Sequence, residues 1–268
     1  MNVLSQQQVD FFNENGFLRI PGVYDADEVE WLSDELERLM EEWAIEGPGW
    51  QGPWREVYMT AEEDEKSILT AMHDLQLYSE AYQRAVVNDT LTGAIADILG
   101  PNIELHHSTL HAKAPETGTP FPMHQDYPFY QHEGPAFIDA IIHIDAATEE
   151  NGCLKFLAGS HKLGPLQHIR GDSGHSLPTD VYRLEDAVSV PADAGDVVLF
   201  SYQTVHGSSL NRTDRWRRLV RVGYRDPDNL QIAGQSVDRP GVIVRGQKRN
   251  RGLEDPLARE RAAQMAQA

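Results

Sequence analysis

Short runs of β-prone residues, separated by turn residues, dominate the chain after residue 102 and limit the folds available to it. Glycine, proline, asparagine and aspartate lie between the runs, so each run is expected to end in a turn. Many short strands with this punctuation are typical of a β-sandwich or barrel. We therefore predict a mainly β fold, a jelly roll with flanking helices. The expected strands are 103–112, 137–144, 153–157, 188–190, 196–202 and 219–224.

The first hundred residues carry helical patterns instead. Ser5 and Gln8 fit a capping box and Gly16 fits the position after a helix end, so a helix is expected between them, followed by a strand at 17–20. Further helices are expected at about 25–43, 67–75 and 79–99, with a loop at 46–66. These N-terminal helices should pack on one outer face of the barrel.

The chain contains no linker long enough to divide it, so we predict a single domain over residues 1–268. Within it we expect a helical part at about 1–100, a jelly-roll core at about 103–225 and a polar C-terminal tail at about 245–268. Cys153 is the single cysteine, which excludes an intramolecular disulfide, and we interpret it as a buried structural residue.

Composition narrows the possible partners. The formal net charge of -19 argues against nucleic acid or an anionic membrane as a partner, and no apolar run approaches the length of a membrane span. No basic leader precedes the first expected helix, so a cytoplasmic location is predicted. A small-molecule substrate is the partner we expect; the sequence does not indicate an oligomeric state.

The segment His124-Gln125-Asp126 carries the first chemical signal. In a strand, residues two apart project from the same face, so an imidazole and a carboxylate could reach one metal ion together. His206 is the natural third ligand, and two histidines with one carboxylate form the facial triad of non-haem Fe(II) oxygenases. By composition alone, roughly 1.7 pairs of this kind are expected by chance. A second pair, His143 and Asp145, is present, and a structural role is the alternative for either pair.

Further segments in fixed order extend this signal into a family resemblance. They are Phe11-Phe12-Asn13-Glu14-Asn15-Gly16-Phe17, His124-Gln125-Asp126, Asn151-Gly152-Cys153-Leu154, Gly159-Ser160-His161-Lys162, Gly195-Asp196 and His206-Gly207-Ser208. Their order and spacing resemble the phytanoyl-CoA dioxygenase family of Fe(II)- and 2-oxoglutarate-dependent oxygenases, which are built on a double-stranded β-helix of cupin-like form. The resemblance implies Fe(II), 2-oxoglutarate and O2 as cofactors, with His124, Asp126 and His206 as iron ligands. It leaves His143 as a core or pocket-wall residue.

The same resemblance points to residues that hold 2-oxoglutarate. Arg217, eleven residues after His206, matches the arginine that binds the far carboxylate, and Ser208 matches a hydroxyl that assists it. Strand alternation leaves Arg218 as the alternative, because it shares a face with Val220, Val222 and Tyr224. Thr109 and Gln125 are further expected contacts to 2-oxoglutarate.

Substrate contacts are expected around the same pocket. The candidates are Lys113, Tyr127, Phe129, His132, Ile141 and Arg225, and Ile141 stands where many relatives carry tryptophan, a change that would enlarge the pocket. Asp126 fills the position that related iron halogenases leave open for chloride, so hydroxylation is favoured. The predicted reaction is hydroxylation of an unactivated C–H bond of a small metabolite or biosynthetic intermediate, with release of succinate and CO2.

The sequence leaves three other hypotheses about the function open. The first is an acyl-CoA 2-hydroxylase with the same chemistry. The second is a non-redox, metal-dependent cupin-type isomerase or hydrolase that uses the same three ligands without oxygen. The third is a jelly-roll module that binds a ligand without catalysis.

Overall fold

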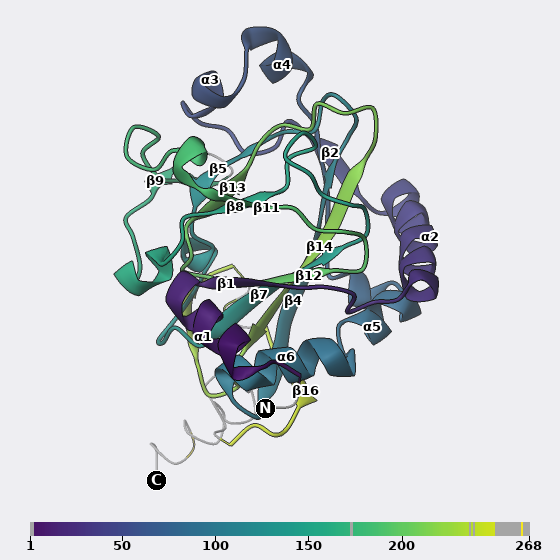
Figure 1. Ribbon diagram of the computed structural model, residues 1–268, viewed down its shortest axis with the longest axis vertical. Coiled ribbons are helices and arrows are strands. Elements are labelled where there is room, and N and C mark those ends of the chain that lie inside the picture. The colour runs from purple at the N-terminus through teal and green to yellow at the C-terminus, as the bar shows by residue number, and fades with distance from the viewer. Residues whose placement is uncertain (1–2, 172–173, 236, 238, 250–263, 265–268) are drawn as a thin grey trace.

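Two facing antiparallel sheets form the centre of the molecule (Figure 1). The computed structural model describes residues 3–171, 174–235, 237, 239–249 and 264. The major sheet has the order β1-β12-β7-β14-β4-β3-β2, with β16 also paired to β4, and the minor sheet has the order β11-β8-β13-β5. This arrangement confirms the predicted jelly roll.

Strand lengths follow the short β-prone runs of the sequence. The major sheet consists of β1 (Phe17–Ile20), β2 (Ile45–Gly47), β3 (Leu69–His73), β4 (Ile103–Lys113), β7 (Phe137–His143), β12 (Val197–Ser201), β14 (Arg217–Arg225) and β16 (Val242–Arg245). The minor sheet consists of β5 (Phe121–His124), β8 (Leu154–Phe156), β11 (Val188–Val190) and β13 (His206–Ser208). Two small ribbons, β6 (Tyr130–His132) with β15 (Gln231–Gly234) and β9 (Ile169–Arg170) with β10 (His175–Ser176), lie outside these sheets.

Four helices pack on the outer face of the major sheet, as predicted: α1 (Gln6–Asn15), α2 (Ala26–Glu42), α5 (Glu80–Ala85) and α6 (Asp89–Leu99). Two short helices, α3 (Arg55–Tyr58) and α4 (Ala61–Lys66), lie at one end of the molecule (Figure 1). Short 3-10 turns are η1 (Leu75–Leu77), η2 (Tyr127–Phe129), η3 (Ser160–Leu163) and η4 (Leu184–Asp186). Leu36 of α2 and Tyr82 of α5 share the largest hydrophobic cluster with Val220 and Val222 of β14. The outward-facing apolar side chains of β14, Val220 and Val222, therefore pack against the helices.

The space between the sheets holds a smaller apolar cluster. Ile141, Phe200 and Leu219 from the major sheet meet Leu154 and Phe156 from the minor sheet there. Alternation along β14 decides which residues reach this interior, because side chains of successive residues point to opposite faces. Since Val220 and Val222 face the helices, Arg217, Leu219 and Arg221 face inward.

Local signals predicted several elements correctly. The capping box of Ser5 with Gln8 begins α1, and Gly16 ends it with φ 82°. The strand at 17–20, the helix at about 25–43 and the six later strands are confirmed within a few residues. None of the helices in the described part of the chain is long and apolar enough to cross a membrane.

The segment 67–75 was predicted to be helical, and this prediction is wrong. It forms strand β3, whose register pairs Leu69 with Lys113 and His73 with Thr109 of β4. Pairing with a central strand outweighs the local helical pattern, since propensity is a weak prior beside tertiary contacts. The N-terminal hundred residues thus supply three strands, β1, β2 and β3, to the major sheet.

Two further boundaries differ from the expectation. The expected helix at 79–99 is two helices, because Asn88 interrupts it and caps α6 by accepting from the backbone of Thr90 and Leu91. The expected loop at 46–66 contains β2, α3 and α4. The predicted tail at 245–268 lies outside the described residues beyond residue 249, except for residue 264.

Candidate active site

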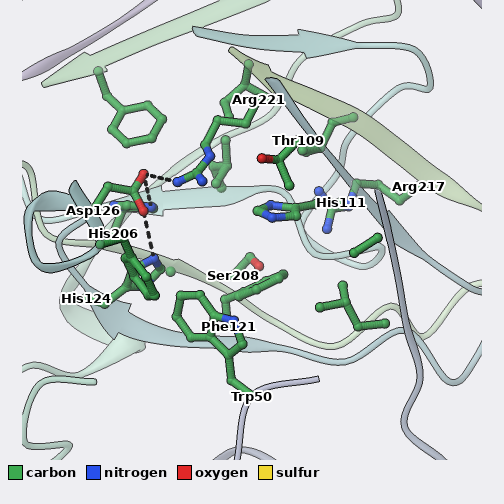
Figure 2. Close-up of a pocket in the computed structure, with 18 of the residues that line it drawn as sticks. Trp50, Thr109, His111, Phe121, His124, Asp126, His206, Ser208, Arg217 and Arg221 are labelled. Carbon is green, nitrogen blue, oxygen red and sulfur yellow. Dashed lines mark ion pairs between the residues drawn. The ribbon is translucent and has the colours of Figure 1, made fainter. Parts of the chain in front are cut away.

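His124, Asp126 and His206 meet between the two sheets and can hold one metal ion. His124 and His206 lie directly opposite each other on the paired strands β5 and β13. Asp126 Oδ1 is 3.6 Å from His124 Nε2, and Asp126 Oδ2 is 3.8 Å from His206 Nε2. The ligand atoms of all three residues lie within 4.8 Å of one another, and all three side chains are buried. Figure 2 shows the three converging on one point.

The protonation of both histidines suits metal binding. His124 Nδ1 donates to the carbonyl of Pro122 at 2.7 Å, and His206 Nδ1 donates to the carbonyl of Thr204 at 3.0 Å. Each Nε2 therefore carries a lone pair directed at the site. Burial, with a contribution from His124, lowers the pKa of His206 to about 3, so its imidazole is neutral at physiological pH. Two imidazoles whose Nε2 atoms point at the site, together with one carboxylate, fit Fe(II).

Asp126 lies in a turn and not in the predicted strand. The prediction placed it on a strand two residues after His124, but β5 ends at His124 and Asp126 has helical backbone angles, φ -78° and ψ -18°. Its backbone N–H donates to the carbonyl of Tyr202 at 2.9 Å, which fixes the turn. Burial raises the pKa of Asp126, but Arg221 and the two histidines outweigh it and hold that pKa well below its usual range.

The buried Arg217 lies at the other end of the cavity, and a second buried basic residue, Lys113, lies beside it. Arg217 is 1% exposed and Lys113 is fully buried, and the two residues are partners in the register of β14 and β4. The Nε and Nη2 atoms of Arg217 have no hydrogen-bond partner, and neither cation forms an ion pair within the described part of the chain. Burial lowers the pKa of Arg217 to about 10 and depresses that of Lys113 well below its usual range. An unpaired buried charge is costly, so this end of the cavity is built for an anion.

Ser208 completes the anion site. Its Oγ accepts a hydrogen bond from Lys113 Nζ at 2.7 Å, which leaves the hydroxyl proton free for a ligand in the cavity. Lys113 was expected in the substrate pocket, but the structure places it beside Arg217 and Ser208. Its Nζ also donates to the carbonyl of Ser209.

The structure separates Arg217 from the alternative, Arg218. Arg218 lies on the outer face of β14, where it pairs with Asp145 at 2.8 Å and donates to Ser33 of α2 at 3.0 Å. That ion pair also gives Asp145 of the second His-x-Asp motif a structural partner. Geometry therefore favours Arg217 as the residue that faces a 2-oxoglutarate carboxylate.

One cavity of about 200 Å³ joins the triad to Arg217. Of the predicted residues, Thr109, Phe129, Ile141, Ser208 and Arg217 line it together with the three proposed ligands. Figure 2 shows Thr109 and His111 between the triad and Arg217. The cavity thus has the three proposed metal ligands at one end and the buried Arg217 at the other, an arrangement that a keto acid with a distal carboxylate could occupy.

Besides Lys113, four predicted site residues do not line the cavity. Gln125 uses its amide on the backbone of Gly164, Leu166 and Gln203. Tyr127 packs on the ring of Tyr202 at 5.5 Å. His132 and Arg225 bond each other at 3.2 Å, and Arg225 pairs with Glu104, away from the triad. The polar groups of Gln125, His132 and Arg225 bond other partners and the ring of Tyr127 packs on Tyr202, so these four residues are not part of the proposed site.

Several lining residues escaped prediction. They are Trp50, Leu69, Ala71, His73, His111, Phe121, Leu154, Phe200, Gly207, Leu219, Arg221 and Gln235. Arg221 could have been found, because it lies four residues after Arg217 and shares its face of a strand. Trp50 comes from the segment that was interpreted as a loop. Its ring lies 4.8 Å from the ring of His124, a contact that no local sequence pattern indicates.

Arg55 holds the segment that carries Trp50. Its guanidinium donates to the carbonyls of Pro48 at 2.9 Å and Trp50 at 2.8 Å, and it also bonds Asp64 and Ser67. Replacing Arg55 by alanine leaves these acceptors unpaired, so we expect the free energy of unfolding to fall by about 2–3 kcal/mol. Urea denaturation would measure the change.

The control is Arg38→Ala, which removes an exposed arginine whose ion pairs lie along α2. Such pairs contribute about 0.3–0.5 kcal/mol. Equal losses in Arg55→Ala and Arg38→Ala would contradict the role of Arg55.

Comparisons with known proteins agree with this geometry. The profile of the family described as phytanoyl-CoA dioxygenase (PhyH) matches residues 12–219. The chain is 26% identical over 241 residues to the probable alpha-ketoglutarate-dependent hypophosphite dioxygenase of Stutzerimonas stutzeri, covering 87% of this chain and 82% of that protein. It is 28% identical over 257 residues to peroxisomal phytanoyl-CoA dioxygenase of Rattus norvegicus, covering 90% and 74% respectively.

A solved structure with similar architecture contains the expected cofactors. The epimerase SnoN in complex with Fe3+, alpha-ketoglutarate (2-oxoglutarate) and nogalamycin RO has a TM-score of 0.69 at 21% identity, covering 91% of this chain and 96% of that one. Fe(II), 2-oxoglutarate and O2 are the cofactors of such enzymes, and the His-Asp-His cluster is present here. The chain belongs to the phytanoyl-CoA dioxygenase family and is a 2-oxoglutarate-dependent non-haem iron dioxygenase.

Proposed function

We propose that this dioxygenase hydroxylates an unactivated C–H bond of a small metabolite or biosynthetic intermediate that carries a hydrogen-bond donor. The observation that supports the proposal most strongly is the single cavity with a His-Asp-His cluster at one end and the unpaired Arg217 at the other. In this proposal His124, Asp126 and His206 hold Fe(II). Arg217 and Ser208 receive the distal carboxylate of 2-oxoglutarate.

Each residue then has a defined task. When bound, Fe(II) and 2-oxoglutarate couple oxidative decarboxylation of the keto acid to oxidation of the substrate, releasing succinate and CO2. Arg217 neutralises and orients the distal carboxylate, and the Ser208 hydroxyl, which already accepts from Lys113, donates to the same group. Trp50 and Phe129, whose ring centroids are 5.0 Å apart, exclude water beside His124. Exclusion of water protects a reactive site from side reactions.

A second chamber of about 200 Å³ supports the substrate class. It shares His73, Arg221 and Gln235 with the first cavity and is also lined by His107. His107 is 7% exposed, and its Nε2 has no hydrogen-bond partner. We assign this chamber to the polar end of the substrate.

A hydrogen-bond chain defines what His107 can bind. Gln231 Nε2 donates to the carbonyls of Ala233 at 3.1 Å and Gln235 at 2.7 Å, so its Oε1 accepts from His106 Nε2 at 2.8 Å. His106 Nδ1 must then accept from His107 Nδ1 at 2.8 Å. His107 Nε2 is left as an acceptor, which favours a substrate with a hydroxyl or N–H group. Burial also holds the pKa of His107 well below its usual range, so the ring stays neutral.

An acyl-CoA ester is disfavoured as substrate because most arginines of segment 212–225 are buried or paired with acids. In segment 212–225, Arg217 and Arg225 are buried, and Arg218, Arg221 and Arg212 pair with Asp145, Asp126 and Glu63. The one strongly exposed arginine, Arg215, lies 3.7 Å from Asp214. A phosphate-rich carrier needs several exposed cations. The described surface around this segment does not present such a group.

The test is substrate-stimulated release of succinate from 2-oxoglutarate, using small hydroxylated and amino compounds with their O- or N-methylated analogues. We expect compounds with a free donor to stimulate release and their methylated analogues to lose about 5- to 150-fold, since an unpaired buried acceptor costs about 1–3 kcal/mol. In His107→Leu the two analogues should converge. Turnover with Zn(II) or Mn(II) in the absence of 2-oxoglutarate would instead favour the non-redox isomerase or hydrolase.

A further inference from the structure

Arg221 joins the proposed iron ligand Asp126 to a second buried acid, Asp139. Arg221 Nη1 is 2.7 Å from Asp126 Oδ2, and Arg221 Nε is 3.8 Å from Asp139 Oδ1. The side chains of Asp126 and Asp139 are 1% and 0% exposed, and that of Arg221 is 12% exposed. Two buried carboxylates therefore share one guanidinium.

Tyr130 closes this chain of contacts. Its hydroxyl accepts from Arg221 Nη1 at 3.1 Å and donates to Asp139 Oδ2 at 2.8 Å. The guanidinium carbon of Arg221 also lies 5.6 Å from the centre of the Tyr130 ring. The hydrogen bond to Tyr130 therefore orients the guanidinium without any ligand, whereas the 3.8 Å contact of Nε with Asp139 is electrostatic only, because neither atom makes a hydrogen bond.

The location of Arg221 connects the two sheets. On β14 it is paired with Thr109 of β4 and with Ile141 of β7, in the middle of the major sheet. His124 and His206, by contrast, lie on the minor sheet, and Asp126 follows directly after β5. Figure 2 shows the Arg221 side chain crossing the interior towards Asp126. The ion pair therefore connects the turn that carries the Asp126 carboxylate to a strand in the interior of the major sheet.

We propose that Arg221 is a positioning residue that holds Asp126 Oδ2 and leaves Oδ1 as the single carboxylate oxygen for the metal. This inference rests on the proposed role of Asp126 as an iron ligand. A carboxylate that binds through one oxygen occupies one position of the metal, so the remaining positions stay open for the keto acid and oxygen. Partners that orient a metal-binding carboxylate typically contribute 10- to 100-fold to metal affinity or activity.

The experiment compares Arg221→Gln and Arg221→Lys with the wild-type protein in anaerobic Fe(II) titrations with and without 2-oxoglutarate. Arg221→Gln should weaken Fe(II) binding by about 10- to 100-fold and displace the visible absorption band of the Fe(II)–2-oxoglutarate complex. Arg221→Lys, which keeps the charge with fewer donors, should lose less. Tyr130→Phe, a milder change that removes one contact to the guanidinium, should weaken Fe(II) binding by a smaller factor than Arg221→Gln.

The matched control is Arg218→Gln, which removes another ion-paired arginine of β14 on the opposite face. It should bind Fe(II) as the wild type does, and thermal unfolding of each metal-free variant reports damage to the fold. If Arg221→Gln and Tyr130→Phe both keep wild-type affinity and an unmoved band, or if Arg218→Gln is weakened equally, the positioning role is refuted. If the wild type itself forms no band, the oxygenase function fails and this inference fails with it.

Discussion

Replacing Arg217 with methionine is expected to weaken 2-oxoglutarate binding strongly while making the metal-free protein more stable. Losing one partner of a buried, hydrogen-bonded charge pair costs about 2–5 kcal/mol. This corresponds to an increase of about 30- to 5,000-fold in the Kd for 2-oxoglutarate. Isothermal titration under anaerobic conditions, with Fe(II) present, would measure the change.

The gain in stability has a separate cause. In the free protein the Arg217 guanidinium is buried with Nε and Nη2 unpaired, and Lys113 lies beside it. An apolar side chain of similar length avoids the desolvation of this charge, and replacing buried charges in this way stabilises proteins by up to about 4 kcal/mol. A gain of 1 kcal/mol raises the Tm of a chain of this size by about 2–4 °C.

The control for this prediction is Arg218→Met. It loses the ion pair with Asp145 on the outer face and should bind 2-oxoglutarate normally. If Arg217→Met retains wild-type affinity and Arg218→Met does not, the two arginines have been assigned to the wrong roles. A fall in the Tm of Arg217→Met would show that the guanidinium is already paired in the free protein.

Replacing His206 with alanine is expected to abolish Fe(II) binding and all 2-oxoglutarate-dependent release of succinate. His206 supplies one of only two imidazoles in the cluster, and its Nε2 is free because Nδ1 donates to Thr204. Removing a residue that only orients a metal ligand lowers metal affinity by about 10- to 100-fold. Removing the ligand His206 itself should therefore lower Fe(II) affinity by more than about 100-fold. Anaerobic Fe(II) titration and a succinate assay would measure it.

His161→Ala provides a matched control. This histidine lies outside the cavity, where its Nε2 contacts the carbonyl of Asn13 at 3.1 Å, and its replacement should leave Fe(II) affinity unchanged. Wild-type metal affinity in His206→Ala would remove the basis for a three-residue iron site.

Sequence patterns predicted the fold well where the determinants were local. The cap at Ser5, the apolar stripe of α2 and the turn residues around the later strands all act over a few residues. Strand β3 was mistaken for a helix because its conformation depends on pairing with β4, some forty residues away in the chain. That pairing joins Leu69 to Lys113, a contact that no local pattern encodes.

The site divides in the same way. The facial-triad pattern indicated His124, Asp126 and His206, and the family resemblance added Arg217. The sequence did not decide between Arg217 and Arg218, because that choice depends on which face of β14 the helices cover. Trp50 and Arg221 reach the proposed ligands from other parts of the chain, so their contacts with His124 and Asp126 follow from tertiary structure alone. Gln125 was included because of its neighbours, although its amide serves the backbone around Gly164 and Gln203.

The most direct test of the account is an anaerobic titration of the metal-free protein with Fe(II) and then 2-oxoglutarate, followed by visible absorption. Chelation of Fe(II) by the keto acid gives a weak charge-transfer band, and we expect this band only when both are present. It should be lost in His206→Ala and require far more 2-oxoglutarate in Arg217→Met. Tight binding of Fe(II) with no band at saturating 2-oxoglutarate would contradict the account and favour a metal enzyme that does not use the keto acid.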